Sequence, residues 1–315
     1  LYPVRPNKQR MVLLWVLAGL VLGSALAFLL NLLDNTFKGS EDVERRLGLP
    51  VLGQLVQLKV GRDEALSPMN QFVDQSSSAF AESIRTIRTG VMLSMLDNEH
   101  SVVVVSSSIP GEGKTTLAIN LAHSIAQMKK TLLVDADMRR PMVHRAKSIG
   151  KPRPGVSALV TGEAAFHEVI DLQDDGLHII PSGTVPANPL ELLSSIRFRE
   201  LVEHWRTEYE VVIIDSAPTL AVSDALVVSQ LADALIYVIR ADATPFQAAE
   251  QGIKRLRRVD APVLGCVLNQ VAVAGRSYGG KYGRYGRYSR YGRYGYYNQA
   301  DYHGYYGEDS TDKRA

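Results

Sequence analysis

A glycine-containing stretch near the middle of the chain carries the residue types of a phosphate-binding loop. It reads Ser-Ser-Ser-Ile-Pro-Gly-Glu-Gly-Lys-Thr-Thr and covers residues 106–116. Backbone N–H groups in such a loop, with the N-terminus of a following helix, bind polyphosphate. We expect Lys114 to reach the β- and γ-phosphates of a nucleotide and the Thr115 hydroxyl to bind Mg²⁺. The loop residues predicted to bind ATP or ADP are Ser108, Pro110, Gly111, Glu112, Gly113, Lys114, Thr115 and Thr116.

One position departs from the usual pattern G-x-x-x-x-G-K-[ST]. The residue at its first Gly is Ser108. Because Ser makes this turn only with an ordinary φ angle, we expect the start of the loop to differ slightly from a loop that begins with Gly.

Aspartates lie at the ends of two apolar, strand-like runs. Asp135 and Asp137 follow one run, and Asp215 ends another, as a Walker B carboxylate does. Phosphoryl transfer needs held phosphates, neutralised charge and a positioned nucleophile. We predict that Lys114 and Thr115, together with Asp137 and Asp215, supply these parts, and that Asp215 holds Mg²⁺ directly or through water.

Apolar runs alternate with helical patterns through most of the chain. The expected strands are 102–105, 131–135, 177–181, 211–215, 234–239 and 263–268, and the expected helices include 79–96, 189–205 and 245–258. This alternation predicts an α/β fold, a mostly parallel sheet with helices on both faces. Ligands of such sheets bind at the carboxyl ends of the strands, where the aspartates lie.

The N-terminal part differs from the rest in composition. Residues 11–30 are twenty uncharged residues, long enough to span a membrane as a helix. ATP is available on the cytoplasmic side, so we place the chain from about residue 34 onward in the cytoplasm. A short helix, 40–47, is expected with Ser40 as its N-cap, and a strand-like piece, 51–58, follows it. The chain begins with Leu1, which suggests a fragment of a longer protein.

The net charge and the cysteine count of the whole chain bear on its partners and on disulfide bonds. The net charge of +2 gives no argument for nucleic acid binding, and none is expected. The single cysteine, Cys266, cannot form an internal disulfide.

The loop, the D-x-D-x-R segment after a strand and the hydrophobic-D-S-x-P segment together resemble the bacterial tyrosine kinases (BY-kinases) of exopolysaccharide and capsule export. The resemblance implies a P-loop NTPase fold with Walker A, A′ and B motifs at 106–116, 131–139 and 211–215. It implies that Asp137 is linked to Mg²⁺ and is a candidate base for the tyrosine hydroxyl. The resulting catalytic set is Lys114, Asp135, Asp137 and Asp215, and the metal set is Thr115, Asp137 and Asp215.

Other segments extend the resemblance. Glu82, Arg85 and Arg88 form an E-x-x-R-x-x-R, which resembles the contact that joins kinase domains into a homo-oligomeric ring. Asn269 occupies the place where this fold class often reads the purine. The apolar segment after Pro3 and Pro6 resembles the second span of a polysaccharide co-polymerase of the inner membrane. Such a protein implies a cognate tyrosine phosphatase and polymerase or export proteins as partners.

Residues 275–315 leave the globular pattern and are expected to be disordered. This segment, the tail, holds eleven of the 14 tyrosines and, between 276 and 293, six basic residues without an acidic one. Such a segment binds single-stranded nucleic acid or serves as a phosphoacceptor cluster, and the ATP site favours the second interpretation. The predicted phosphoacceptors are Tyr278, Tyr282, Tyr285, Tyr288, Tyr291, Tyr294, Tyr296, Tyr297, Tyr302, Tyr305 and Tyr306.

The sequence thus predicts a membrane helix in 1–33, a juxtamembrane linker in 34–75, a kinase domain in 76–274 and the tail. The expected function is a membrane-anchored, ATP- and Mg²⁺-dependent tyrosine autokinase. Two alternatives remain. One is a partitioning-type ATPase switch, against which Ile109 argues because those enzymes carry a signature Lys there. The other is a co-polymerase scaffold.

Overall fold

The computed structural model describes residues 8–33, 35–58, 68–96, 101–146, 153–173 and 175–272. The chain divides into two units, residues 1–36 and residues 37–315, which we treat separately. The eleven predicted phosphoacceptor tyrosines, and Pro3 and Pro6, lie outside the described residues.

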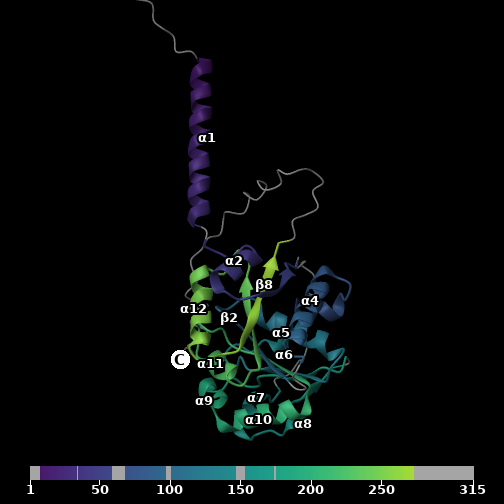
Figure 1. Ribbon diagram of the computed structural model, residues 1–315. Coiled ribbons are helices and arrows are strands. Elements are labelled where there is room, and N and C mark those ends of the chain that lie inside the picture. The colour runs from purple at the N-terminus through teal and green to yellow at the C-terminus, as the bar shows by residue number, and fades with distance from the viewer. Residues whose placement is uncertain are drawn as a thin grey trace, which may run out of the picture. The chain divides into compact units, whose positions relative to one another are not determined.

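The first unit contains one long helix, α1, Lys8–Leu33 (Figure 1). Within it, Gln9–Leu26 is long and apolar enough to cross a membrane, and none of this window is buried. Exposed side chains include Leu14, Trp15 and Leu22. The helix predicted over 11–30 is therefore confirmed.

The second unit is built on one sheet, whose strands run in the order β1-β8-β7-β2-β6-β3-β5-β4 across the described residues. The bounds are β1 Val51–Val56, β2 Ser101–Ser107, β3 Thr131–Asp135, β4 Asp171–Leu172, β5 His178–Ile180, β6 Val211–Asp215, β7 Ala234–Arg240 and β8 Val263–Val271. Neighbouring strands are parallel except β4 and β5. The predicted, mostly parallel sheet is confirmed.

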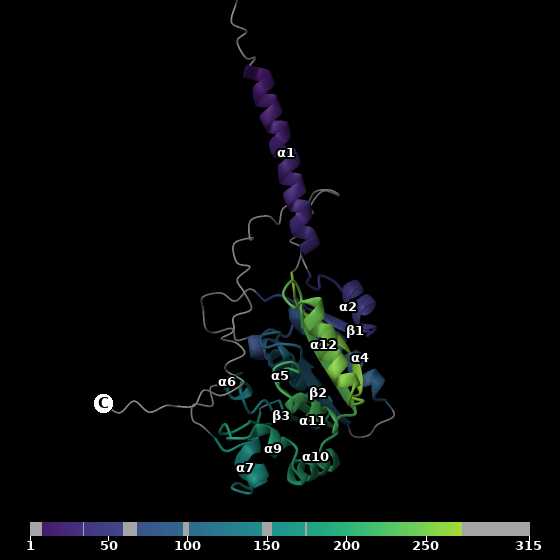
Figure 2. The ribbon, with the colours of Figure 1, turned by 90° about the vertical axis from the view of Figure 1, so that its left-hand side faces the viewer.

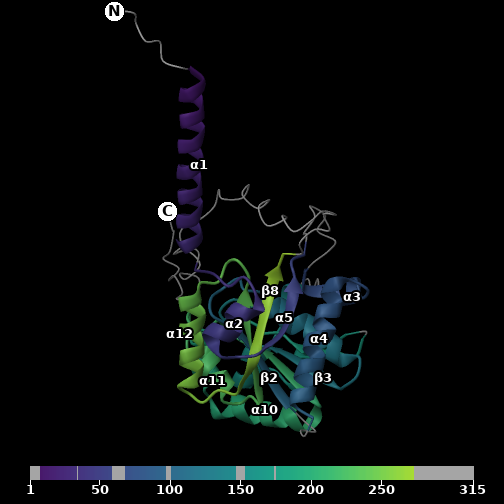
Figure 3. The same ribbon diagram turned by 45° about the horizontal axis from the view of Figure 1, so that its top comes forward.

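Helices cover both faces of the sheet (Figures 1 and 3). One face packs against α3 Gln71–Asp74, α4 Ala79–Ser94, α5 Lys114–Ala126 and α6 Val143–Ala146, with the 3₁₀ turn η1 Pro68–Asn70 beside them. The other packs against α2 Ser40–Leu47, α7 Val156–Thr161, α8 Phe166–Val169, α9 Pro189–Leu193, α10 Ile196–Glu208, α11 Asp224–Ser229 and α12 Phe246–Arg257. Val102 and Val104 of β2 enter one core, and Val103 and Val105 the other. This two-sided burial explains the continuous apolar run in β2.

Two helix predictions need correction. The helix expected over 189–205 is two helices, because the chain breaks after α9 and Ser195 starts α10 by accepting a hydrogen bond from the Phe198 N–H at 3.1 Å. Ser40 is not the N-cap of α2. Gly39 holds that position in an extended conformation, and Ser40 is the first helical residue.

The stretch from 34 to 75, expected as a linker, contributes to the sheet. Its strand β1 pairs in parallel with β8, with Val51 opposite Cys266. Phe37 also forms backbone hydrogen bonds with Asp242 and Thr244, in the turn after β7. The chain from Phe37 onward therefore belongs to the sheet-containing unit.

Candidate nucleotide site

The phosphate-binding loop connects the end of β2 at Ser107 to the start of α5 at Lys114. Gly111 and Gly113 adopt positive φ angles of 83° and 95°. A Cβ added to Gly113 would lie 2.0 Å from Nδ2 of Asn269, so both the backbone conformation and the space require glycine there. Ser108 is not among the described residues with positive φ, and the ordinary φ expected for it is confirmed.

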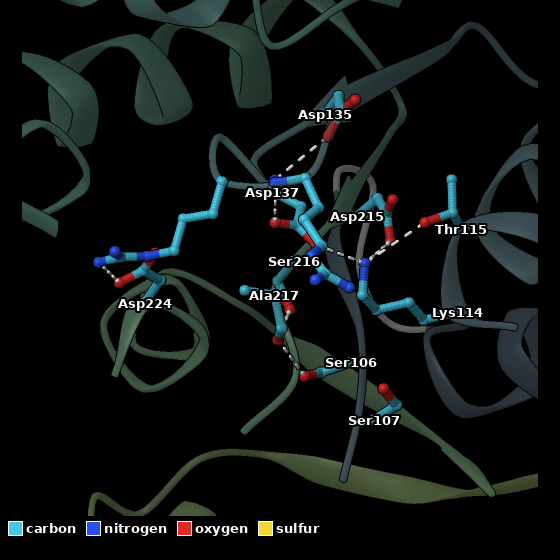
Figure 4. A network of polar contacts seen from close by, with 12 residues as sticks. Ser106, Ser107, Lys114, Thr115, Asp135, Asp137, Asp215, Ser216, Ala217 and Asp224 are labelled. Carbon is cyan, nitrogen blue, oxygen red and sulfur yellow. Dashed lines mark hydrogen bonds and ion pairs between the residues drawn. The ribbon is translucent and has the colours of Figure 1, made fainter. Parts of the chain in front are cut away.

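Lys114 meets two of the predicted aspartates (Figure 4). Its Nζ donates a hydrogen bond to Oδ2 of Asp137 at 2.7 Å and lies 3.8 Å from Oδ1 of Asp215. It also lies 3.4 Å from Oγ1 of Thr115. The sheet brings these side chains together: Asp135 and Asp215 are register partners at the carboxyl ends of β3 and β6, and Asp137 follows Asp135 by two residues. These predicted site residues therefore lie together, although they are up to 101 positions apart in the sequence.

Asp215 is completely buried, and neither of its carboxylate oxygens has a close hydrogen-bond partner among the described residues, although the side chains of Lys114 and Thr115 lie beside it. Burial raises its pKa to about 6, although the charge of Lys114 opposes the rise. A buried carboxylate with open acceptor positions suits a bound cation. Together with Asp137 and the Thr115 hydroxyl it offers the hard oxygen ligands that Mg²⁺ prefers, so these residues fit a magnesium ion.

Asp135 contacts the backbone after β3. Its carboxylate accepts hydrogen bonds from the N–H groups of Asp137, at 3.2 Å, and Val143, at 3.1 Å. Burial and the charges of Asp215 and Asp137 raise its pKa well above the usual range. Asp135 thus shapes the segment that carries Asp137, and its predicted catalytic role stays a prediction.

Arg139, the last residue of the A′ motif, joins this segment to α11. Its guanidinium makes two hydrogen bonds to the buried carboxylate of Asp224, from Nε at 2.8 Å and from Nη2 at 3.2 Å. Such a bidentate pair fixes orientation as well as charge. The contact connects two sides of the site that the sequence alone did not relate.

The other side of the loop is held by a second carboxyl group. Glu112 is buried, and its side chain accepts hydrogen bonds from the Ile109 N–H at 2.7 Å and from the Thr244 hydroxyl. The Thr244 hydroxyl in turn accepts a hydrogen bond from the Arg240 N–H at 3.0 Å. Burial raises the pKa of Glu112 to about 7, although the hydrogen bonds from Thr244 and Ile109 oppose the rise. Glu112 therefore acts as an internal brace of the loop.

Two further residues that the sequence did not identify contact the loop from β7 and the segment after β6. The Tyr237 hydroxyl donates to Oγ of Ser108 at 3.0 Å. The Thr219 N–H donates to the Ser107 carbonyl at 2.8 Å. No local pattern marks these residues, because they reach the loop through strand order. The serine at the first loop position thus gains a hydrogen-bond partner that glycine could not use.

Asn269 lies at the end of β8, close to the loop. Its side-chain amide donates to the Glu112 carbonyl at 2.8 Å, and its side-chain oxygen accepts from the Gln270 N–H at 2.8 Å. Asn269 therefore positions the loop, and its predicted contact with the purine stays a prediction.

The E-x-x-R-x-x-R residues lie on α4. Glu82 and Arg85 form an ion pair at 3.0 Å, and Arg85 also donates to the Ser76 carbonyl. Arg88 donates to the carbonyl of Ser124 on α5 at 2.8 Å. All three are present on one helix, and their predicted role in oligomerisation stays a prediction.

A phosphate loop between a buried strand and a helix, faced by carboxylates at the ends of neighbouring parallel strands, defines a P-loop NTPase. A family model described as "AAA domain" matches residues 100–263. The chain is 34% identical over 211 residues to the tyrosine-protein kinase YwqD of Bacillus subtilis, an alignment that covers 66% of this chain and 89% of that protein. The chain belongs to the bacterial tyrosine kinase (BY-kinase) family.

Solved structures agree. The kinase domain of the Escherichia coli tyrosine kinase ETK matches 77% of this chain and 99% of its own length, with a TM-score of 0.68 and 29% identity. The BceF tyrosine kinase domain matches 75% of this chain and 99% of its own length, with a TM-score of 0.67 and 31% identity. Longer relatives also match. The tyrosine-protein kinase ptk of Acinetobacter johnsonii is 31% identical over 88% of this chain, which spans 39% of that protein's length.

Proposed function

We propose that the chain is an ATP- and Mg²⁺-dependent protein-tyrosine kinase that phosphorylates the tyrosines of its own tail. The observation that carries the proposal is the contact of Lys114 with Asp137 and Asp215 at the mouth of a phosphate loop, in a member of a tyrosine kinase family. The eleven tail tyrosines supply acceptors within the same chain.

Each side chain has a role that its surroundings support. Lys114 binds the transferring phosphate, since it is a cation at the start of α5 beside the loop. Thr115, Asp137 and Asp215 hold Mg²⁺, which neutralises phosphate charge when bound. Asp137 is the candidate base for the tyrosine hydroxyl. The tail follows the last strand and its 41 residues are long enough to extend to a neighbouring copy, so we propose that phosphorylation occurs between subunits.

The remaining parts of the proposal concern location and partners. We propose that α1 anchors the chain in the bacterial inner membrane, with the kinase unit and tail in the cytoplasm, because Gln9–Leu26 is long and apolar enough to span. We propose a ring of copies joined through Glu82, Arg85 and Arg88. A similar protein of Klebsiella pneumoniae is described as a putative tyrosine-protein kinase in the cps region. This supports a role in polysaccharide polymerisation and export, with a tyrosine phosphatase and export proteins as partners.

The test is the intact mass of the full chain in detergent after incubation with Mg-ATP. We expect a ladder of phosphate additions, absent from Lys114→Met and from a chain that lacks residues 275–315. ATP consumption without any ladder would overturn the proposal and favour the partitioning-type switch. A ladder that survives deletion of the tail would place the acceptors elsewhere.

A further inference from the structure

A basic groove lies between α2 and α12, which run beside each other in the views of Figures 1 and 2. It has a volume of about 360 Å³ and is lined by Arg46, Leu47, Glu250, Ile253, Lys254, Arg257 and Arg258. Four of the lining residues lie on α12 at helical spacing, and Arg258 follows as its C-cap, so the five share one side of that helix. Four of the seven lining residues are cations and one is an anion, which leaves the groove strongly positive.

Contacts with neighbouring residues hold two arginines of the groove in place. The guanidinium of Arg46 lies 3.6 Å from the ring centroid of Phe246 and 3.6 Å from the carboxylate of Glu250. Nη2 of Arg257 donates to the Leu47 carbonyl at 2.8 Å. These contacts use part of each guanidinium and leave other N–H groups for a ligand, since Arg carries five donors. Because the contacts also fix the two side chains, less rotamer entropy is lost on binding.

The other two cations are free for a ligand. Lys254 on α12 and Arg258 at its C-cap are exposed, and no ion pair or hydrogen bond joins their side chains to a described residue. Leu47 and Ile253 are buried apolar residues at the base of the groove. The groove therefore combines an apolar base with pre-positioned arginines and unpaired cations. This is the combination that recognises a phosphate carried on an aromatic ring.

We propose that this groove binds phosphotyrosine of the tail, and so captures the tail after it has been phosphorylated. The inference rests on the proposed function, because it requires the tail to be a phosphoacceptor. Charge separates the two forms of the tail. Six basic residues between 276 and 293 are repelled by the groove, whereas each phosphate adds a charge of about −1.5 to −2. Phosphorylation thus converts repulsion into attraction.

The length of the chain permits this contact. The tail leaves the sheet after β8, which ends at Val271, whereas Arg257 ends α12 just before that strand begins. The tail must therefore run back along β8, a distance of about 30 Å for nine residues. Residues 272–282 extend to about 36 Å, so Tyr282 and every later tyrosine of the three-residue repeat can reach the groove.

The test measures binding of a synthetic peptide of residues 282–294 to the full chain in detergent, by fluorescence anisotropy. One form is unphosphorylated, and the other carries phosphate on Tyr285, Tyr288 and Tyr291. We expect the phosphorylated form to bind at least about tenfold more tightly, and Lys254→Glu with Arg258→Glu to remove at least about tenfold of its affinity. Because the peptide is phosphorylated chemically, the result does not depend on kinase activity.

A matched variant separates the groove from general charge. Arg197→Glu with Arg199→Glu makes the same charge change on exposed positions of α10. We expect this variant to bind the phosphopeptide within about twofold of wild type. Glu250→Gln, which removes the carboxylate of the groove, should tighten binding. Equal loss of affinity in both double variants, or equal affinity for the two peptides, would overturn the proposal. Full competition by inorganic phosphate alone would also overturn it, because the groove would then bind any anion.

Discussion

The two sides of the phosphate loop differ in how their charges are compensated. On one side, Lys114 faces the carboxylates of Asp137 and Asp215, and the oxygens of Asp215 have no close hydrogen-bond partner among the described residues. On the other side, the carboxyl group of Glu112 is surrounded by donors from its own loop and from Thr244. Both groups are fully buried. The first side is therefore built to receive a charged ligand and the second to hold the loop in shape.

This contrast separates two kinds of buried carboxylate. A buried acid whose oxygens are satisfied by neutral donors stabilises a local structure. A buried acid with open acceptor positions carries a free-energy cost that a ligand can relieve. Substitution of Asp215 should therefore raise stability while it lowers activity, whereas loss of a hydrogen-bond donor to Glu112 should lower both stability and ATP affinity.

The largest effect is expected for Asp215→Asn. Phosphotransfer should fall by about 10²-fold or more, because one of the carboxylates proposed to hold Mg²⁺ beside the reacting phosphate is lost. Stability should instead rise at neutral pH. The raised pKa of about 6 means that the neutral form is favoured in the fold, so the stabilisation is complete below about pH 4 and is lost as pH rises through 6. Burial then disfavours the ionised group, a cost that Asn avoids.

The measurement combines a phosphotyrosine assay with urea unfolding at pH 8 in the absence of nucleotide. If Asp215→Asn is both inactive and less stable than wild type, Asp215 braces the loop as Glu112 does, and the proposed difference between the two carboxyl groups is wrong.

The next effect concerns the two glycines of the loop. Gly113→Ala should weaken ATP binding by at least about 100-fold, because the new Cβ would lie 2.0 Å from Nδ2 of Asn269 and φ is 95°. Gly111→Ala is the matched control. Its φ is 83°, but a Cβ there meets nothing within 4 Å. Only backbone strain remains, which corresponds to about tenfold. Isothermal titration with ATP distinguishes the two variants. Equal losses of ATP affinity would show that the clash with Asn269 has no effect on binding.

A smaller effect is expected for Thr244→Val, on the bracing side. The change keeps the shape of the side chain but leaves a buried oxygen of Glu112 and the Arg240 N–H without their partner. A loss of this kind costs about 1–3 kcal/mol, and ATP affinity should fall by roughly tenfold. Thr244→Ser keeps the hydroxyl and should bind ATP as wild type does. If Ser fails equally, packing of the methyl group rather than the hydrogen bond holds the loop.

The smallest effect is a change in pH dependence in Glu112→Gln. The pKa of about 7 lies above the usual 4.5, so the stabilisation from this group is complete below about pH 4.5 and is lost as pH rises through 7. Gln does not titrate. The difference in unfolding free energy between variant and wild type should therefore increase, in favour of the variant, from pH 5 to pH 8. Glu163→Gln, at an exposed position, is the control and should show no such trend.

The sequence predicted the elements and the charged side of the site better than the bracing side. Asp135, Asp137 and Asp215 are visible in the sequence because each ends or follows an apolar strand, and parallel strands bring such ends together. Thr244 and Tyr237 carry no comparable local signal. Thr244 meets Glu112 across 132 positions, and only the placement of β7 near the loop creates the contact.

Element boundaries were harder to predict where local signals compete. The strand-like piece over 51–58 was predicted inside a linker, and its membership of the sheet was missed because only the pairing of β1 with β8 reveals it. The antiparallel β4 was not predicted, since it contains only two residues. The break between α9 and α10 was missed because only two residues, Ser194 and Ser195, separate the helices within an otherwise helical pattern.

The parallel pairing of β1 with β8 has a mechanical consequence. The segment that leads to α1 enters β1 at its first residue, and the segment that leads to the tail leaves β8 at its last. Tension between these two ends therefore pulls the strands along their length in opposite directions. The hydrogen bonds between them are stretched together instead of one after another, so the pair resists by shear, the stronger geometry. A force between the two ends of the chain would first act on the contacts of Phe37 with the turn after β7 and then on this pair of strands.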